Sequence, residues 1–132
     1  RRMKSMVSSG PLIIRYSVNI QHIPKEHWTL DPTEGGGRLV GECDHFFDLC
    51  NYITGADPDT IFAQCILDAE QDILRTVNFM VQVRYTNGSL ASLLYTDMGH
   101  PSMPRERVEV FTGSSVLLLE DFKTLRVSLP ID

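Results

Sequence analysis

The strongest constraint on the fold is a pair of strand patterns joined by Asn87-Gly88. In residues 77–85 every second residue is valine, phenylalanine or tyrosine, and most of the residues between them are polar. A half-buried β-strand requires this period of two. Asn-Gly favours the tight turn between antiparallel strands, and residues 89–97 form the next apolar run. The chain therefore contains an antiparallel sheet.

The rest of the chain adds strands and one helical pattern. Five more short extended runs are rich in β-branched and apolar residues: 12–20, 60–68, 107–113, 114–121 and 122–129. Residues 38–53 have a helical period, with Gly55 as the C-terminal cap residue and Pro58 beyond it. We predict an α+β fold: an open, mostly antiparallel sheet of about six strands with one main helix packed on one face.

Composition narrows the function classes. The chain has 132 residues, enough for a single domain with a real core. Its formal net charge of -5 gives no basic surface for nucleic acid or anionic lipid, so neither is expected as a partner. No run is long enough for a membrane span and no signal peptide is evident, so we expect a cytoplasmic protein. The three cysteines fit neither a disulfide framework nor a zinc knuckle and are expected to be reduced.

The start of the chain suggests a piece of a longer protein. Residues 1–11 lack an initiator methionine and lead almost at once into an apolar strand. We therefore expect one domain of a larger protein.

A glycine triplet, residues 35–37, precedes the helical pattern. A dinucleotide-binding loop needs an apolar strand directly before it and the spacing G-x-G-x-x-G. Here residues 29–34 are polar and contain Pro32, and Val40 stands at the third glycine position. The triplet is therefore expected to let the chain bend sharply and pass close to another surface or ligand.

The predicted helix has two different faces, because each residue advances about 100° around the axis. One face is an apolar stripe, made of Leu39, Cys43, Phe46, Phe47, Cys50 and Ile53. His45 lies away from this stripe, with Gly41 one turn before it and Asp48 three residues after it. Histidine titrates near neutrality, and Asp48 can stabilise its charged form or fix its tautomer. The same spacing is also typical of an ordinary surface ion pair, so the sequence leaves two interpretations of His45: an acid/base residue or a surface histidine paired with an acid. A zinc site or a Cys-His nucleophile pair is not expected, because the cysteines point into the stripe.

At these residues the sequence resembles the C-terminal domain of the Gfo/Idh/MocA oxidoreductases, named after glucose-fructose oxidoreductase, inositol dehydrogenase and a rhizopine-catabolism protein. The helix in that family commonly carries Gly-Gly and then His-x-x-Asp-Leu, and here Gly36-Gly37 leads to His45, Asp48 and Leu49. The segments DPTEGGGRLVGE, VRYTNGSLASLLYT and PRERVEVFTG extend the resemblance over nearly the whole chain.

The resemblance implies an activity and a site. It implies a parent enzyme with an N-terminal Rossmann domain for NAD or NADP, which transfers hydride to or from a sugar, inositol or related polyol. His45 is then the acid/base residue, assisted by Asp48 and by a lysine of the nucleotide domain. The family often has an aspartate four residues before the histidine, where this chain has Gly41, and Glu42 is next in line.

Further substrate contacts are expected at the first strand, the long loop and the start of the helix, from Asn19, His27, Trp28, Arg38 and Glu42. Three of these residues also have a structural interpretation: Asn19 can cap the strand end, Trp28 can anchor the loop, and Arg38 can pair with Glu34 or Glu42.

Three function classes follow. The first is the substrate-side domain of an NAD(P)-dependent sugar or polyol dehydrogenase, inactive alone and without its own cofactor site. The second is a non-catalytic binding or oligomerisation module on the same sheet. The third is a metal-dependent enzyme, for which no ligands are assigned. Consecutive apolar residues in 89–95 and 114–121 point to both sides of the sheet, so a homodimer or homotetramer through the open face is expected.

Overall fold

The computed structural model describes residues 1–67 and 72–131. The helices of the described residues are α1 (Arg2–Ser5), η1 (Trp28–Leu30), α2 (Gly37–Gly41), α3 (Cys43–Thr54) and η2 (Ile73–Arg75). The strands are β1 (Ile13–Asn19), β2 (Pro58–Cys65), β3 (Phe79–Tyr85), β4 (Leu90–Thr96), β5 (Glu106–Thr112), β6 (Ser115–Glu120) and β7 (Thr124–Ser128). Every helix over these residues is too short and too polar to cross a bilayer.

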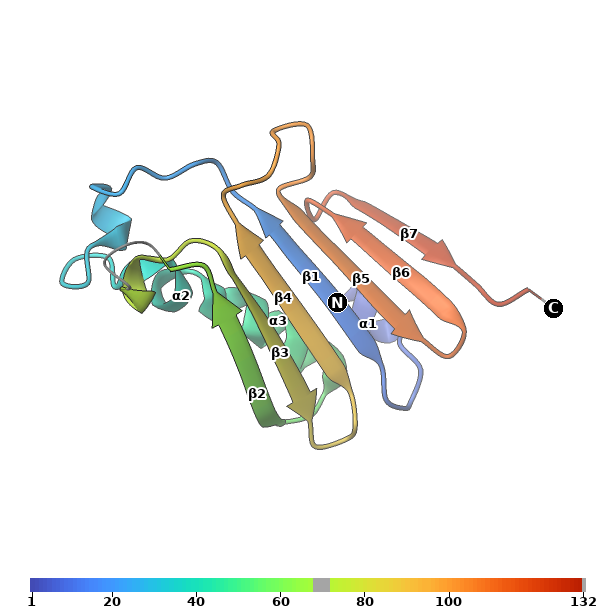
Figure 1. The fold of residues 1–132 in the computed structure, drawn as a ribbon. Coiled ribbons are helices and arrows are strands. Elements are labelled where there is room, and N and C mark those ends of the chain that lie inside the picture. Colours follow the sequence, from blue (N-terminus) through green and yellow to red (C-terminus); the bar gives the residue numbers. More distant parts are fainter. Residues whose placement is uncertain (68–71, 132) are drawn as a thin grey trace.

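All seven strands form one open sheet in the order β2-β3-β4-β1-β5-β6-β7 (Figure 1). Neighbouring strands are antiparallel, except that β1 lies parallel to β4. The predicted α+β class and the mostly antiparallel sheet are confirmed. The strand β1 is central because hairpins built later in the chain add to both of its edges.

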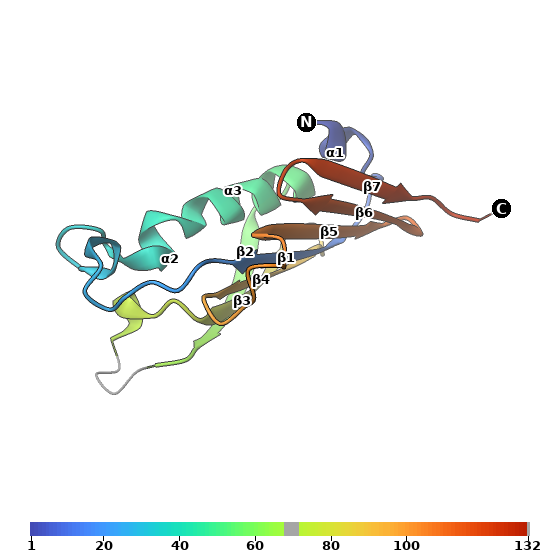
Figure 2. The ribbon, with the colours of Figure 1, turned by 90° about the horizontal axis from the view of Figure 1, so that it is seen from above.

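The helices α1, α2 and α3 lie on one face of the sheet, and α3 is the longest of them (Figure 2). The apolar stripe of α3 meets the inward side chains of the central strands, and Cys43, Phe46, Cys50 and Ile53 are buried there. Rings contribute to this core: the centroids of Tyr16 and Phe46 lie 5.0 Å apart. The alternation along β3 is the predicted one, with buried and exposed residues in strict succession. The stripe therefore fixes which face of α3 is left for solvent.

The single helix predicted over residues 38–53 is wrong in one respect. The segment is two helices, because Glu42 leaves the helical conformation with φ -138° and ψ -32°. Gly41 is a weak helix former, and the Glu42 carboxylate is bonded to Tyr95 of β4 and to Arg105, which directly precedes β5, so the break is stabilised from outside the helix. The predicted end is confirmed, since Gly55 caps α3 with φ 67°.

Strand boundaries differ from the pattern by one or more residues. The run 77–85 enters the sheet only at Phe79, because Thr76 and Asn78 use their side chains for loop contacts. The run 60–68 is displaced to Pro58–Cys65, and Asp68 lies outside the described residues. The hairpin at Asn87-Gly88 is confirmed: the Tyr85 amide donates to the Ser89 carbonyl at 2.9 Å, and Gly88 has φ 84°.

The glycine triplet packs against backbone from two other segments. A Cβ atom on Gly35 would lie 2.5 Å from Cα of Thr29, and one on Gly37 would lie 2.0 Å from the carbonyl oxygen of Leu74. Gly37 also has φ 80°, a conformation that disfavours other residues. The expected close approach is therefore to the protein's own backbone.

The outer face of the sheet is left uncovered by the helices of the described residues (Figure 2). Large apolar side chains stand exposed on it: Ile13, Phe62, Met80, Leu90, Leu94 and Phe111. Leu93 is 3% exposed and belongs to the core, whereas its neighbour Leu94 is 38% exposed on the outer face. The register thus separates two leucines that the sequence alone leaves equivalent.

Candidate functional site

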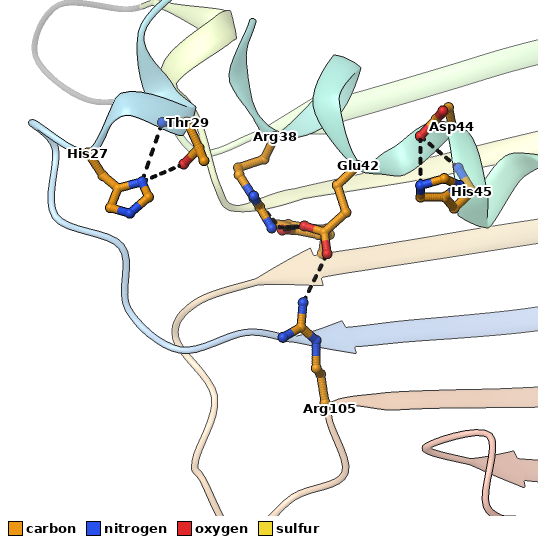
Figure 3. A network of polar contacts seen from close by, with 8 residues as sticks. His27, Thr29, Arg38, Glu42, Asp44, His45 and Arg105 are labelled. Atoms are coloured by element: carbon orange, nitrogen blue, oxygen red, sulfur yellow. Dashed lines mark hydrogen bonds and ion pairs between the residues drawn. The ribbon is translucent and has the colours of Figure 1, made fainter. Parts of the chain in front are cut away.

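Polar contacts converge on Glu42 at the junction of α2 and α3 (Figure 3). The Glu42 carboxylate accepts hydrogen bonds from Nη2 of Arg105 at 2.9 Å and from the hydroxyl of Tyr95 at 2.6 Å. It also pairs with Arg38, whose Nε donates to the same Tyr95 hydroxyl at 2.8 Å. The Glu42 side chain is only 18% exposed, so two cations and one hydroxyl compensate its burial. This settles the partner of Arg38 as Glu42.

The Tyr95 hydroxyl is neutral at this position. Burial raises the pKa of Tyr95, and the hydrogen bond and charge of Arg38 oppose that rise. A neutral hydroxyl both accepts from Arg38 and donates to Glu42, which links the helix junction to β4. The network thus fixes the position from which α3 begins.

A large open pocket lies beside this network, at the end of the sheet where the parallel strands β1 and β4 finish. Its volume is about 840 Å³. We call it the polar pocket; among its lining residues are Asn19, His22, His27, Arg38, Asp97, Arg105 and Asp121. Three of the predicted substrate contacts, Asn19, His27 and Arg38, therefore share one pocket.

Two of these residues also hold loops in place. Asn19 donates from Nδ2 to the carbonyl oxygen of His100 at 3.0 Å, which ties the end of β1 to the loop before β5. Nδ1 of His27 lies 2.8 Å from the hydroxyl of Thr29. Trp28 is 60% exposed beside His27, with ring centroids 5.9 Å apart, and it is not among the residues that line the polar pocket.

His45 lies on a separate, smaller groove of about 330 Å³. We call it the His45 groove; it is lined by Tyr16, His45, Phe46, Asp48, Leu49, Tyr52, Glu106 and Phe122. The His45 side chain is 78% exposed, and its Nε2 lies 3.9 Å from Oδ1 of Asp44. Asp48 lines the same groove, while the carboxylate that pairs with the ring is that of Asp44. Figure 3 shows His45 and Asp44 one turn along from Glu42.

Arg105 and Glu106 connect the two concave regions. Arg105 lines the polar pocket, and Glu106, the first residue of β5, lines the His45 groove. Burial raises the pKa of Glu106; Arg105 opposes this rise and Asp121 adds to it. Sequence reasoning missed both residues and also Tyr95. The adjacent charges of Arg105 and Glu106 at the start of a predicted strand were a signal, but Glu42, which pairs with Arg105, is 63 residues away.

The cysteines of α3 are part of the core. Cys43 and Cys50 are buried, and burial raises the pKa of each thiol to about 12. They therefore stay protonated and lie on the opposite side of the helix from His45.

The glycine triplet does not fit a dinucleotide. A phosphate-binding loop needs free backbone amides at the start of a helix, and here Gly35 and Gly37 are packed against the backbone of Thr29 and Leu74. The helix that follows, α2, has only five residues. This loop is a packing element.

An open sheet with helices on one face, and with ionisable residues where its main helix begins, is the architecture of this chain. The chain belongs to the GFO/IDH/MocA C-terminal domain family, whose model matches residues 1–114.

Solved structures of larger proteins contain the same fold. An aldose-aldose oxidoreductase from Caulobacter crescentus, complexed with glycerol, matches with a TM-score of 0.73 at 15% identity, over 91% of this chain and 37% of that one. The UDP-N-acetylglucosamine 3-dehydrogenase GnnA from Acidithiobacillus ferrooxidans matches at 0.68 and 17%, over 89% and 35%. The WlbA dehydrogenase from Bordetella pertussis, in complex with NADH and UDP-GlcNAcA, matches at 0.63 and 16%, over 81% and 34%.

The chain spans about a third of the length of these proteins. Because the sequence identities are only 15–17%, the similarity to these proteins shows a shared fold and nothing more. Comparison with curated proteins finds no relative.

Proposed function

We propose that this chain is the substrate-side domain of an NAD(P)-dependent oxidoreductase that acts on a hydroxyl or carbonyl carbon of a sugar, inositol or related polyol. In the parent enzyme a Rossmann domain holds the nicotinamide, which exchanges the hydride. This chain supplies the proton transfer and the hydroxyl contacts.

The observation that carries the proposal is the placement of His45. It is exposed on the polar side of α3, at a groove, and the apolar stripe on the other side of the helix holds the backbone in place. Membership of an oxidoreductase domain family gives this exposed histidine a chemical context. A general base needs access to a substrate hydroxyl and a rigid mount, and His45 has both.

In the proposed mechanism the imidazole of His45 takes the proton of the substrate hydroxyl during oxidation and returns it during reduction. The Asp44 carboxylate lies 3.9 Å from Nε2 and orients the ring, and Asp48 lies on the same groove. Asn19, His27 and Arg38 contact other hydroxyls from the polar pocket, which Arg105 also lines.

Glu42 has a positioning role in this proposal. Its carboxylate is already bonded to Arg38, Arg105 and Tyr95, so it is not placed to relay a proton in the way of the family aspartate that Gly41 replaces. His45 therefore exchanges its proton with the lysine of the nucleotide domain or with solvent.

The test is turnover of the full-length parent enzyme with His45→Ala. A general acid/base contributes about 10²–10⁴-fold, and turnover is expected to fall by that factor while the fold stays intact. His100→Ala is the matched control: that histidine is also exposed but lines neither concave region, and its backbone contact to Asn19 remains. Asp48→Asn is expected to cost less than His45→Ala. Full activity in His45→Ala would contradict the proposal.

A second role is supported by the outer sheet face. Exposed Ile13, Leu90, Leu94 and Phe111 lie on adjacent central strands there, and a second copy of the face would cover them. We propose that the parent forms a homodimer or homotetramer through this face. A purely non-catalytic oligomerisation module would share the face but would not need His45.

A further inference from the structure

The turn between β6 and β7 has an unusual residue at its tip. Asp121 and Phe122 both have positive φ, 49° and 53°. The loop between the paired residues Glu120 and Thr124 has three residues, and the Lys123 amide donates to the Glu120 carbonyl oxygen at 3.0 Å, so Asp121 and Phe122 are the central residues of a tight turn. Positive φ at both central positions of such a turn strongly favours Asn-Gly or Asp-Gly. Here phenylalanine stands in the second position, where glycine carries no strain and a bulky residue does. Residues held in such conformations cluster at functional sites.

The turn is fixed against the start of β5. The Asp121 amide donates to the Glu106 carbonyl oxygen at 2.8 Å, and the Glu106 amide donates to Oδ1 of Asp121 at 3.0 Å. Glu106 itself lines the His45 groove, so the turn is anchored at the groove wall. Figure 2 shows this hairpin turn on the side of the sheet that carries α3.

The strained ring lies on the groove and stays largely in solvent. Phe122 lines the His45 groove and is 56% exposed, so core packing does not explain it. Tyr52 of α3 lines the same groove and is 49% exposed. The groove thus combines two accessible aromatic rings with His45, Asp48 and Glu106. A ring sugar or cyclitol presents apolar C–H faces and polar hydroxyls, and this wall offers a partner for each.

We infer that Phe122, with Tyr52, forms a stacking surface for the C–H face of a pyranose or cyclitol ring whose hydroxyls meet His45 and Asp48. This inference rests on the proposed function and narrows its substrate class to cyclic polyols. Phe122 lies outside the residues 1–114 that the family model matches, whereas Tyr52 of α3 lies within them.

The experiment is an NMR titration of this chain with methyl β-D-glucopyranoside, myo-inositol and the open-chain polyol sorbitol. The ring compounds are expected to shift the resonances of Phe122, Tyr52 and His45 together, and sorbitol is expected to bind at least about fivefold more weakly, because it has no ring face.

Three variants separate stacking from folding. Phe122→Ala is expected to raise the Kd of the ring compounds about fivefold, and Phe122→Tyr to keep it within about twofold. Phe122→Gly is expected to lose the same affinity without lowering the Tm, because glycine relieves the strained φ. Phe62→Ala is the matched control, since Phe62 is 60% exposed on β2 and faces away from the groove.

Unchanged affinity in Phe122→Ala, equal binding of sorbitol, or no shift of groove resonances with either ring compound would each overturn the inference. None of these outcomes touches the proposed function, which depends on turnover of His45→Ala in the parent. Conversely, normal turnover of that variant with intact ring binding would refute the proposed function and leave the stacking surface standing.

Discussion

At the residue scale, Glu42 and Glu106 have opposite environments although both are acids near α3. Glu42 is partly buried and is bonded to two arginines and a tyrosine hydroxyl. Glu106 is partly buried at the groove wall, where desolvation raises its pKa and Arg105 compensates only in part. A buried acid without full compensation weakens the folded state once it ionises.

This difference gives a pH prediction for Glu106. Its folded-state pKa is above the ordinary value of 4.5, so the folded state binds the proton more tightly than the unfolded state. The free energy of unfolding therefore falls as pH rises from the ordinary value through the raised one. In Glu106→Gln this fall should disappear, so the variant gains stability relative to wild type as pH rises. Urea unfolding of both proteins across the acidic pH range measures the two free energies of unfolding. A difference between wild type and Glu106→Gln that does not change with pH would contradict the prediction.

Local sequence patterns predict the position of some residues of the candidate site but not of others. His45 could be placed because the helical period around it separates a polar from an apolar side. Arg105 could not be placed, because its contact with Glu42 depends on the pairing of β5 with β1, which no local pattern encodes. Phe122 was missed because a turn residue with positive φ is normally glycine or asparagine.

At the element scale, the glycine triplet positions α2 by close backbone contact. Gly37 combines φ 80° with the approach of the Leu74 carbonyl, so any side chain there meets both strain and a clash. The end of α3 was predictable from Gly55, but the break at Glu42 was not, because tertiary contacts stabilise it.

Gly37→Ala should therefore lower the free energy of unfolding by about 2 kcal/mol or more. Gly10→Ala is the matched control, since a Cβ atom there would meet nothing within 4 Å; its effect should stay within about 0.5 kcal/mol. Chemical denaturation of both variants measures the difference. Equal stability of the two would show that the close approach at Gly37 is not required.

At the scale of the whole molecule, the antiparallel hairpins were predictable from their turns, whereas the parallel pairing of β1 with β4 was not. That pairing joins segments about 77 residues apart, as in Ile13 opposite Leu90. The pairing of β1 with β4 brings the exposed apolar side chains of these two strands together on the outer face, which is the surface proposed to bind a second copy of the chain.

The outer face predicts a contrast between neighbouring leucines. Leu94→Lys should separate the proposed oligomer into folded monomers, because Leu94 is exposed on that face. Leu93→Lys should instead unfold the domain, because it places a charge in the core. Light scattering and circular dichroism distinguish the two effects. A wild-type monomer at micromolar concentration would contradict the proposed assembly.

The packed glycine triplet predicts that this chain alone neither binds NAD(P) measurably nor transfers hydride. Calorimetric titration with NAD, NADH, NADP and NADPH measures the binding. Micromolar affinity for any of them would show that the nucleotide site lies within this chain.

The most direct measurement of the central claim is chemical rescue of His45→Ala in the full-length enzyme. If His45 carries the substrate proton, added imidazole should restore part of the lost turnover, and His100→Ala should neither lose activity nor respond to imidazole. A folded His45→Ala enzyme that keeps wild-type turnover, or one whose lost turnover imidazole does not restore, would contradict the assignment of His45 as the acid/base residue.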